Sequence, residues 1–223
     1  MPLCLVSAAH GAFSLTPSNI ILDVKKGKVS GWFELTHTGG APAAIEFTLS
    51  ERVLDINGVF RKDTLVETKD LLINPTQVIL LPGEKKRVQV ILTNPKNIKA
   101  DKLYNINAKE IPLEGLKSNP DGPAVQMGIV FLMNYNSSVI VETGGRGRLT
   151  FVSSKEIGDG VIEVIAENKT NFRVKKDGRL MVNNKRINEF TGGQTSIMPG
   201  TARRFTFKHD KPLTAREFSY RHD

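Results

Sequence analysis

The chain has 223 residues, of which 39% are hydrophobic, so it is long enough for one large or two modest globular domains. Its 31 Lys and Arg residues against 23 Asp and Glu residues give a formal net charge of +8, which suits nucleic acid, an anionic membrane or an acidic partner. No segment approaches the ~20 consecutive apolar residues of a membrane span, so no span is predicted.

The basic residues favour a solvated basic surface over a nucleic-acid site. They are scattered in short runs at turns and strand starts, and no RNA- or DNA-binding signature accompanies them. A basic nucleic-acid binder remains a third alternative, which predicts retention on heparin that falls steeply with salt. The runs are Lys25-Lys26, Lys85-Lys86-Arg87, Lys175-Lys176 and Arg203-Arg204.

The first eleven residues favour the remnant of a secretory signal over a frayed N-terminus. They are small and apolar, carry no Lys, Arg, Asp or Glu, and end in the small-x-small pattern Ala9-His10-Gly11. We therefore expect residues 1–11 to be removed and the mature chain to begin near Ala12. The only cysteine, Cys4, lies in this segment, so the mature chain would contain no disulfide.

Short strand-like runs separated by turn residues follow in chain order. Alternating apolar and polar residues predict strands with one buried face, and Asn57-Gly58 is a strong hairpin signal. A Tyr that opens a strand just after Asp101 resembles the tyrosine corner of immunoglobulin-like sandwiches. The first-domain runs are 13–24, 29–36, 44–49, 53–56, 71–81, 87–93 and 104–111.

A repeated phrase predicts a second, related domain. Residues 79–90 and 197–207 each contain an apolar pair, Pro-Gly, two further residues, a basic pair and an alternating strand. Pro and Gly at adjacent positions indicate a turn. The repeat lies about one domain length away, so we expect an all-β protein of two immunoglobulin-like sandwiches, at 12–138 and 139–223, with a hinge near Gly144–Gly147.

Nothing in the sequence supports an enzyme, a metal site or a cofactor. The four histidines, His10, His37, His209 and His222, lie far apart in the sequence and show no metal-ligand spacing. Recognised catalytic motifs are absent, and the glycines at 144–147 lack the pattern of a phosphate-binding loop.

The longest apolar stretch, residues 124–135, allows two interpretations. A strand that is apolar on both faces is typical of a buried core strand. Alternatively, it is an edge strand whose open apolar row pairs with a partner's sheet, since long exposed apolar edges are otherwise avoided. The row in question consists of Val125, Met127, Ile129 and Phe131. The two methionines of this strand face, Met127 and Met133, suit a promiscuous groove because thioethers adapt to irregular gaps.

With these landmarks the sequence resembles the PapD-like periplasmic chaperones of pilus assembly over almost its whole length from Phe13. The matching segments are 18–22, His37-Thr-Gly-Gly, the Asn-Pro to Pro-Gly strand at 74–90, Asp101 to Pro112, the alternating strand and the second-domain repeat. The resemblance implies a boomerang of two immunoglobulin-like domains that binds pilin subunits and delivers them to an outer-membrane usher. It also implies donor-strand complementation, in which the chaperone lends its alternating strand to the subunit.

The resemblance also exposes a departure from the family pattern. The family holds the subunit's terminal carboxylate with an Arg in the first strand and a Lys at the end of the donor strand; by an ungapped count these positions are Asn19 and Asn134. Either a neighbour such as Arg87 or Lys109 substitutes, or the subunit is held differently, or the chain has another role. A structural or adhesive immunoglobulin-like surface protein is the competing function.

Overall fold

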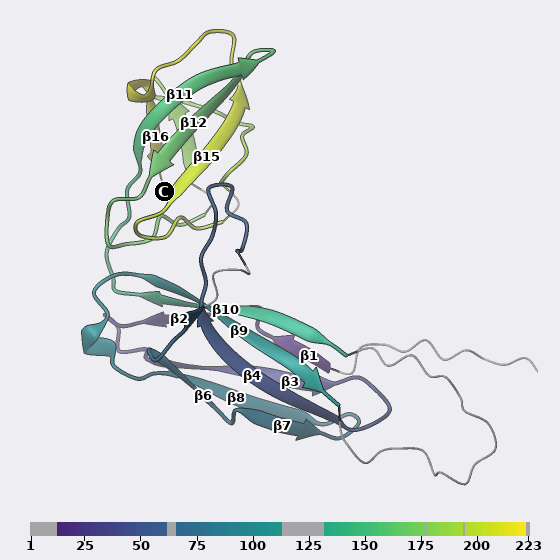
Figure 1. Ribbon diagram of the computed structural model, residues 1–223. Coiled ribbons are helices and arrows are strands. Elements are labelled where there is room, and N and C mark those ends of the chain that lie inside the picture. The colour runs from purple at the N-terminus through teal and green to yellow at the C-terminus, as the bar shows by residue number, and fades with distance from the viewer. Residues whose placement is uncertain (1–12, 62–65, 113–131, 177, 194, 222–223) are drawn as a thin grey trace, which may run out of the picture.

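The computed structural model describes residues 13–61, 66–112, 132–176, 178–193 and 195–221. It contains two β-sandwiches joined by a short connection and set at an angle to one another, which gives the molecule a bent shape (Figure 1). The predicted fold class, two all-β domains in a boomerang arrangement, is confirmed. Within the described residues, the helical segments are the short 3₁₀ turns η2 (Pro95–Asn97) and η3 (Ala215–Glu217).

One sheet of the first sandwich has four antiparallel strands. Their order is β1 (Phe13–Thr16), β3 (Ser30–His37), β8 (Lys85–Leu92) and β6 (Leu71–Asn74). The alternation seen in the sequence decides which face is buried: Val88, Val90 and Leu92 of β8 point into the core, and the residues between them do not.

The opposite sheet carries the strands that border the second domain. Its order is β2 (Asn19–Asp23), β10 (Asn134–Glu142), β9 (Lys102–Ile111), β4 (Ala43–Glu51) and β5 (Val66–Glu67), with β7 (Gln77–Leu80) paired to the other end of β4. β2 is parallel to β10, whereas β9 is antiparallel to it. Ile45, Tyr104, Ile106, Val139 and Val141 of this sheet are fully buried against the first sheet.

The second sandwich is smaller and has a core of its own. One sheet contains β11 (Thr150–Gly158), β12 (Val161–Glu167) and β15 (Ala202–Lys208); the other contains β14 (Lys185–Arg186), β13 (Arg179–Val182) and β16 (Phe218–Arg221). Aromatic rings fill much of the space between them, including Phe151, Phe205 and Phe218.

The predicted Pro-Gly turns occur where the sequence placed them, whereas the Tyr104 hydroxyl bonds a side chain 34 positions upstream, unlike the local backbone contact of a tyrosine corner. Gly83 and Gly200 of the two Pro-Gly phrases have φ of 76° and 70°, and each turn leads into a strand, β8 or β15. Such positive φ values favour glycine. Tyr104 is fully buried and donates a hydrogen bond to Asp70 Oδ2 at 2.6 Å.

Two elements differ from the sequence expectation. The run 13–24 is two strands, β1 and β2, which belong to opposite sheets and are separated at Pro17. Residues 139–142, expected to open the second domain, continue β10 within the first sandwich. The expected division after residue 138 falls within this strand, and we place the division between Glu142 and Thr150 instead.

Candidate functional site

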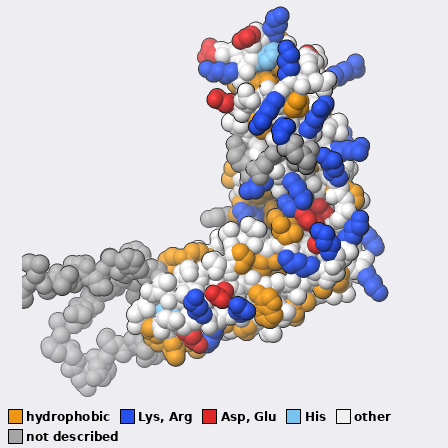
Figure 2. Space-filling model, turned by 180° about the vertical axis from the view of Figure 1, so that it is seen from behind, with side chains coloured by type: hydrophobic (Ala, Val, Ile, Leu, Met, Phe, Trp, Pro, Cys, Tyr) orange, Lys and Arg blue, Asp and Glu red, His pale blue; other side chains and the backbone are white. Residues whose placement is uncertain are grey.

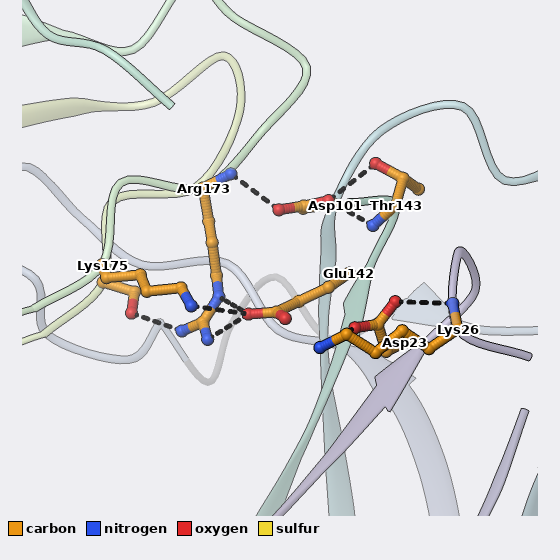
Figure 3. Close-up of polar contacts among 8 residues, drawn as sticks. Asp23, Lys26, Asp101, Glu142, Thr143, Arg173 and Lys175 are labelled. Carbon is orange, nitrogen blue, oxygen red and sulfur yellow. Dashed lines mark hydrogen bonds and ion pairs between the residues drawn. The ribbon is translucent and has the colours of Figure 1, made fainter. Parts of the chain in front are cut away.

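A buried carboxylate joins the two domains at their junction. Asp101, which is 5% exposed, precedes β9; its Oδ1 accepts hydrogen bonds from the Thr143 backbone N–H at 2.7 Å and hydroxyl at 2.8 Å. Its Oδ2 accepts the backbone N–H of Arg173, in the second domain, at 2.8 Å (Figure 3). One side chain therefore fixes the interdomain connection and a loop of the second sandwich at once.

Arg173 makes the second link across the junction. Its guanidinium binds Glu142 Oε1 through Nε at 2.8 Å and also through Nη2 (Figure 3). It also donates from Nη1 to the Ser196 hydroxyl at 2.9 Å. Both charged side chains are largely buried. Because a buried charge is tolerated only when it is paired and hydrogen-bonded, this ion pair holds Glu142 and Arg173 in one arrangement.

A hairpin of the first domain forms a third link. Residues 52–61, between β4 and β5, rise from the first sandwich alongside the second (Figure 1). At its tip the Ile56 carbonyl accepts the backbone N–H of Arg204 at 2.8 Å. Gly58 has φ of 80°, and a Cβ there would overlap the guanidinium of the buried Arg203, so this turn requires glycine.

These links enclose a cleft of about 430 Å³ between the hairpin, the sheet of β2, β10 and β9, and the second domain. Cationic and apolar side chains both line it. The lining residues used below are Asn19, Ile21, Arg52, Leu54, Leu103, Ser138, Ile140, Lys175, Lys176 and Met198.

Arg52 is the cation placed most precisely in the cleft. Its Nη1 donates to the Ser138 hydroxyl at 2.6 Å, and its guanidinium carbon lies 4.5 Å from the centre of the Phe60 ring. The register pairs Ser138 with Asn19 on β2, so Arg52 contacts the residue of β10 that lies opposite Asn19. Burial lowers the pKa of Arg52, and its Nε is buried without a hydrogen-bond partner in the described structure.

The second domain supplies further positive charge. Lys175 and Lys176 are exposed at the cleft, and Lys and Arg side chains gather at the bend and over the second domain in Figure 2. Lys175 lies 3.9 Å from Glu142, which Arg173 already binds. Within the part of the chain that the structure describes, neither Arg52 nor Lys176 forms an ion pair. The cleft is therefore suited to an anionic group.

Next to the cleft, one edge of β10 is open. β2 pairs with β10 only from Ser138 onwards, whereas β9 pairs with it from Asn134 to Val141. Considering only the described residues, no strand pairs with the other edge of β10 from Asn134 to Ser137. An open sheet edge can hydrogen-bond to an incoming strand, and this one leads directly to Arg52.

The structure separates the four residues considered for the carboxylate. Asn19 lines the cleft, but Asn134 lies at the far end of β10, opposite Lys109. Arg87 projects from the outer face of the other sheet, where it binds Glu34 at 3.5 Å. Arg87, Lys109 and Asn134 are thus not among the cleft residues, and Arg52 is.

Sequence reasoning missed Arg52 because the signal is not local. Arg52 and Ser138 are 86 positions apart, and only the fold of the hairpin brings them together. The predicted open row of Val125, Met127, Ile129 and Phe131 lies outside the described residues. In the sequence, these positions continue the alternation of Met133 and Tyr135, which pack against the core.

Comparison with solved structures identifies proteins of similar fold. The E. coli chaperone DraB aligns with 94% of this chain and 88% of its own, at 13% identity and a TM-score of 0.55. A chain of the CsuC–CsuE chaperone–tip adhesion subunit complex from Acinetobacter baumannii aligns with 91% of this chain and 92% of its own, at 11% identity and a TM-score of 0.54. A chain of the Salmonella enterica complex of SafA pilin with the SafB chaperone aligns with 89% of this chain and 85% of its own, at 13% identity and a TM-score of 0.56.

The chain therefore has the fold of fimbrial chaperones, and its predicted resemblance to PapD-like proteins is confirmed at the level of the fold. No protein-family model matches the sequence, and no curated protein matches it. Among the described residues, no helix is long and apolar enough to cross a membrane. The same residues contain no group of three or more His, Cys, Asp or Glu side chains arranged to hold a metal ion.

Proposed function

We propose that this protein is a periplasmic chaperone that binds pilus or fimbrial subunits by donor-strand complementation and delivers them to an outer-membrane usher. The observation that carries the proposal is the cationic cleft at the end of the open edge of β10. Two of the similar structures are complexes of a chaperone with a pilin or a tip subunit. No catalytic role is proposed.

In this mechanism the subunit adds a strand along the open edge of β10. Main-chain hydrogen bonds then supply affinity that depends little on sequence, and alternate side chains supply selectivity. We assign Val125, Met127, Ile129 and Phe131 to the row that fills the subunit's groove. These residues precede Asn134 in the sequence, so the row and the open edge belong to one continuous segment.

The end of the added strand meets the cleft, where we propose that Arg52 binds the subunit's terminal carboxylate. A hydrogen bond between ionised groups is about twice as strong as a neutral one. Lys175 and Lys176 add positive charge from the opposite wall. Asn19 and Ser138 then offer hydrogen bonds beside the cation, in place of the charges expected from the family pattern.

Periplasmic co-expression with candidate pilin subunits of the same genome tests the proposal. A tagged chaperone should co-purify with its subunit and protect it from periplasmic proteases. An unrelated immunoglobulin-like protein, expressed at the same level, is the control. Equal degradation of every subunit with and without the chaperone would contradict the proposed function and favour a structural or adhesive role.

A further inference from the structure

The cleft contains an apolar region in addition to its cations. Five side chains form it. Three come from the sheet strands β2, β10 and β9, one comes from the hairpin, and one comes from the second domain. None of them is needed to bind a carboxylate. They are Ile21, Ile140, Leu103, Leu54 and Met198.

The sheet register places the apolar region directly beside the carboxylate position. Ile21, Ile140 and Leu103 are register partners and form one row across β2, β10 and β9. The neighbouring row contains Asn19 and Ser138, the residue that Arg52 contacts. Rows on one face of a sheet lie about 7 Å apart, which a single amino-acid residue spans from its carboxylate to the end of its side chain.

The hairpin also places a polar residue next to an apolar one in the cleft. Arg52 and Leu54 are two positions apart in the hairpin, and both line the cleft. On both the sheet and the hairpin, a polar residue is thus followed two positions later by an apolar one. Ile21 is 37% exposed, and Leu54, Leu103 and Ile140 are only partly buried, so each retains apolar surface that a ligand can cover.

We propose that the cleft selects subunits whose last residue has an apolar side chain. This inference rests on the proposed function and deepens it, since it adds the chemistry of the terminal side chain to the binding of the carboxylate. The apolar row covers that side chain while Arg52 holds the carboxylate of the same residue. A terminal Lys or Arg is disfavoured because it would approach Arg52, Lys175 and Lys176, which carry the same charge.

Fluorescence anisotropy with synthetic peptides tests the inference on the full-length protein. The probes share one Ser- and Gly-containing sequence with an N-terminal fluorescein and end in Phe, Leu, Gly or Lys with a free carboxylate; a fifth ends in Phe amide. Peptides ending in Phe or Leu should bind at least about tenfold more tightly than those ending in Gly or Lys, because even one methylene in an apolar pocket is worth roughly tenfold. Leu54→Ala and Ile21→Ala should each reduce this preference, whereas Ile157→Ala, half exposed on β11, should not.

The outcomes separate this inference from the proposed function. If the peptides ending in Phe and Gly with a free carboxylate bind equally and the peptide ending in Phe amide binds weakly, the carboxylate site stands. The selectivity for apolar terminal residues is then overturned. If the Phe acid and Phe amide bind equally, the carboxylate site itself fails. Absence of binding by every acid peptide overturns both. A preference for Phe that survives in both Leu54→Ala and Ile21→Ala also contradicts the inference.

Discussion

Arg52 of the interdomain hairpin donates a 2.6 Å hydrogen bond to the hydroxyl of Ser138 on β10, and so places a guanidinium at the end of the open sheet edge. Phe60 lies against the same guanidinium and Ser138 faces Asn19 across the sheet. The cation is thus positioned by neutral groups. Its charge is available to an incoming anion.

Replacing Arg52 by Gln should weaken subunit binding by about tenfold to a hundredfold. A hydrogen bond to a charged group contributes about 1.5–3 kcal/mol, and each 1.4 kcal/mol is a factor of ten in affinity. Titration of a purified subunit into each variant measures the change. Arg87→Gln is the matched control, because Arg87 lies on the other sheet and is 71% exposed. Equal affinities for wild type and Arg52→Gln would refute the role of Arg52.

The contrast between Arg52 and Tyr104 shows what the sequence was able to predict. The burial of Tyr104, the repeated Pro-Gly turns and most strands follow from local patterns, since alternation and turn chemistry act over a few residues. The ungapped count led to Asn134, which the sheet register places opposite Lys109, outside the cleft. The sheet register instead sets Ser138 opposite Asn19.

Local sequence patterns also did not predict the contacts at the junction. The sequence predicted a hinge at the glycines from 144 to 147, but not that Asp101 and Arg173 would meet there. These two residues are 72 positions apart and belong to different domains. Contacts of this kind depend on how two complete sandwiches pack, and that information is spread over the whole chain.

Asp101→Asn should loosen the junction and lower stability by about 1–3 kcal/mol, the usual cost of leaving a buried polar group unpaired. An amide must present its NH₂ group toward either the Thr143 donors or the Arg173 N–H, because both carboxylate oxygens of Asp101 accept hydrogen bonds. Chemical denaturation gives the stability, and small-angle X-ray scattering gives the distribution of interdomain distances. The exposed Asp210→Asn is the control. An unchanged denaturation midpoint and scattering curve would show that Asp101 does not hold the domains together.

Asp70 should make stability depend on pH in the acid range. Hydrogen bonds from Lys102 and then from Tyr104 lower the pKa of Asp70 from its ordinary value of 3.8. A lowered pKa means that the stabilising contribution is present above 3.8 and is lost as pH falls through the pKa of the folded state. Melting temperatures measured from pH 6 to pH 2 should therefore decline less steeply below pH 4 for Asp70→Asn than for wild type. Parallel curves would indicate that Asp70 contributes nothing to acid sensitivity.

Ile129→Lys distinguishes the two interpretations of the segment 124–135. If Val125, Met127, Ile129 and Phe131 form an open row, the charged side chain should abolish subunit binding and leave the thermal melt of the free protein nearly unchanged. If they form a core strand, burying an unpaired lysine should cost several kcal/mol out of a total stability of about 5–15 kcal/mol.

The melt and the binding assay must be read together for this variant. Val152→Lys, on the exposed strand β11, provides a matched control for adding a lysine to an apolar surface position. A melt that collapses only for Ile129→Lys would defeat the donor-strand assignment. An unchanged melt with full subunit binding would also contradict it, because a lysine cannot enter the subunit's apolar groove without losing affinity. Only a stable variant that fails to bind the subunit agrees with a row of side chains held open for a partner.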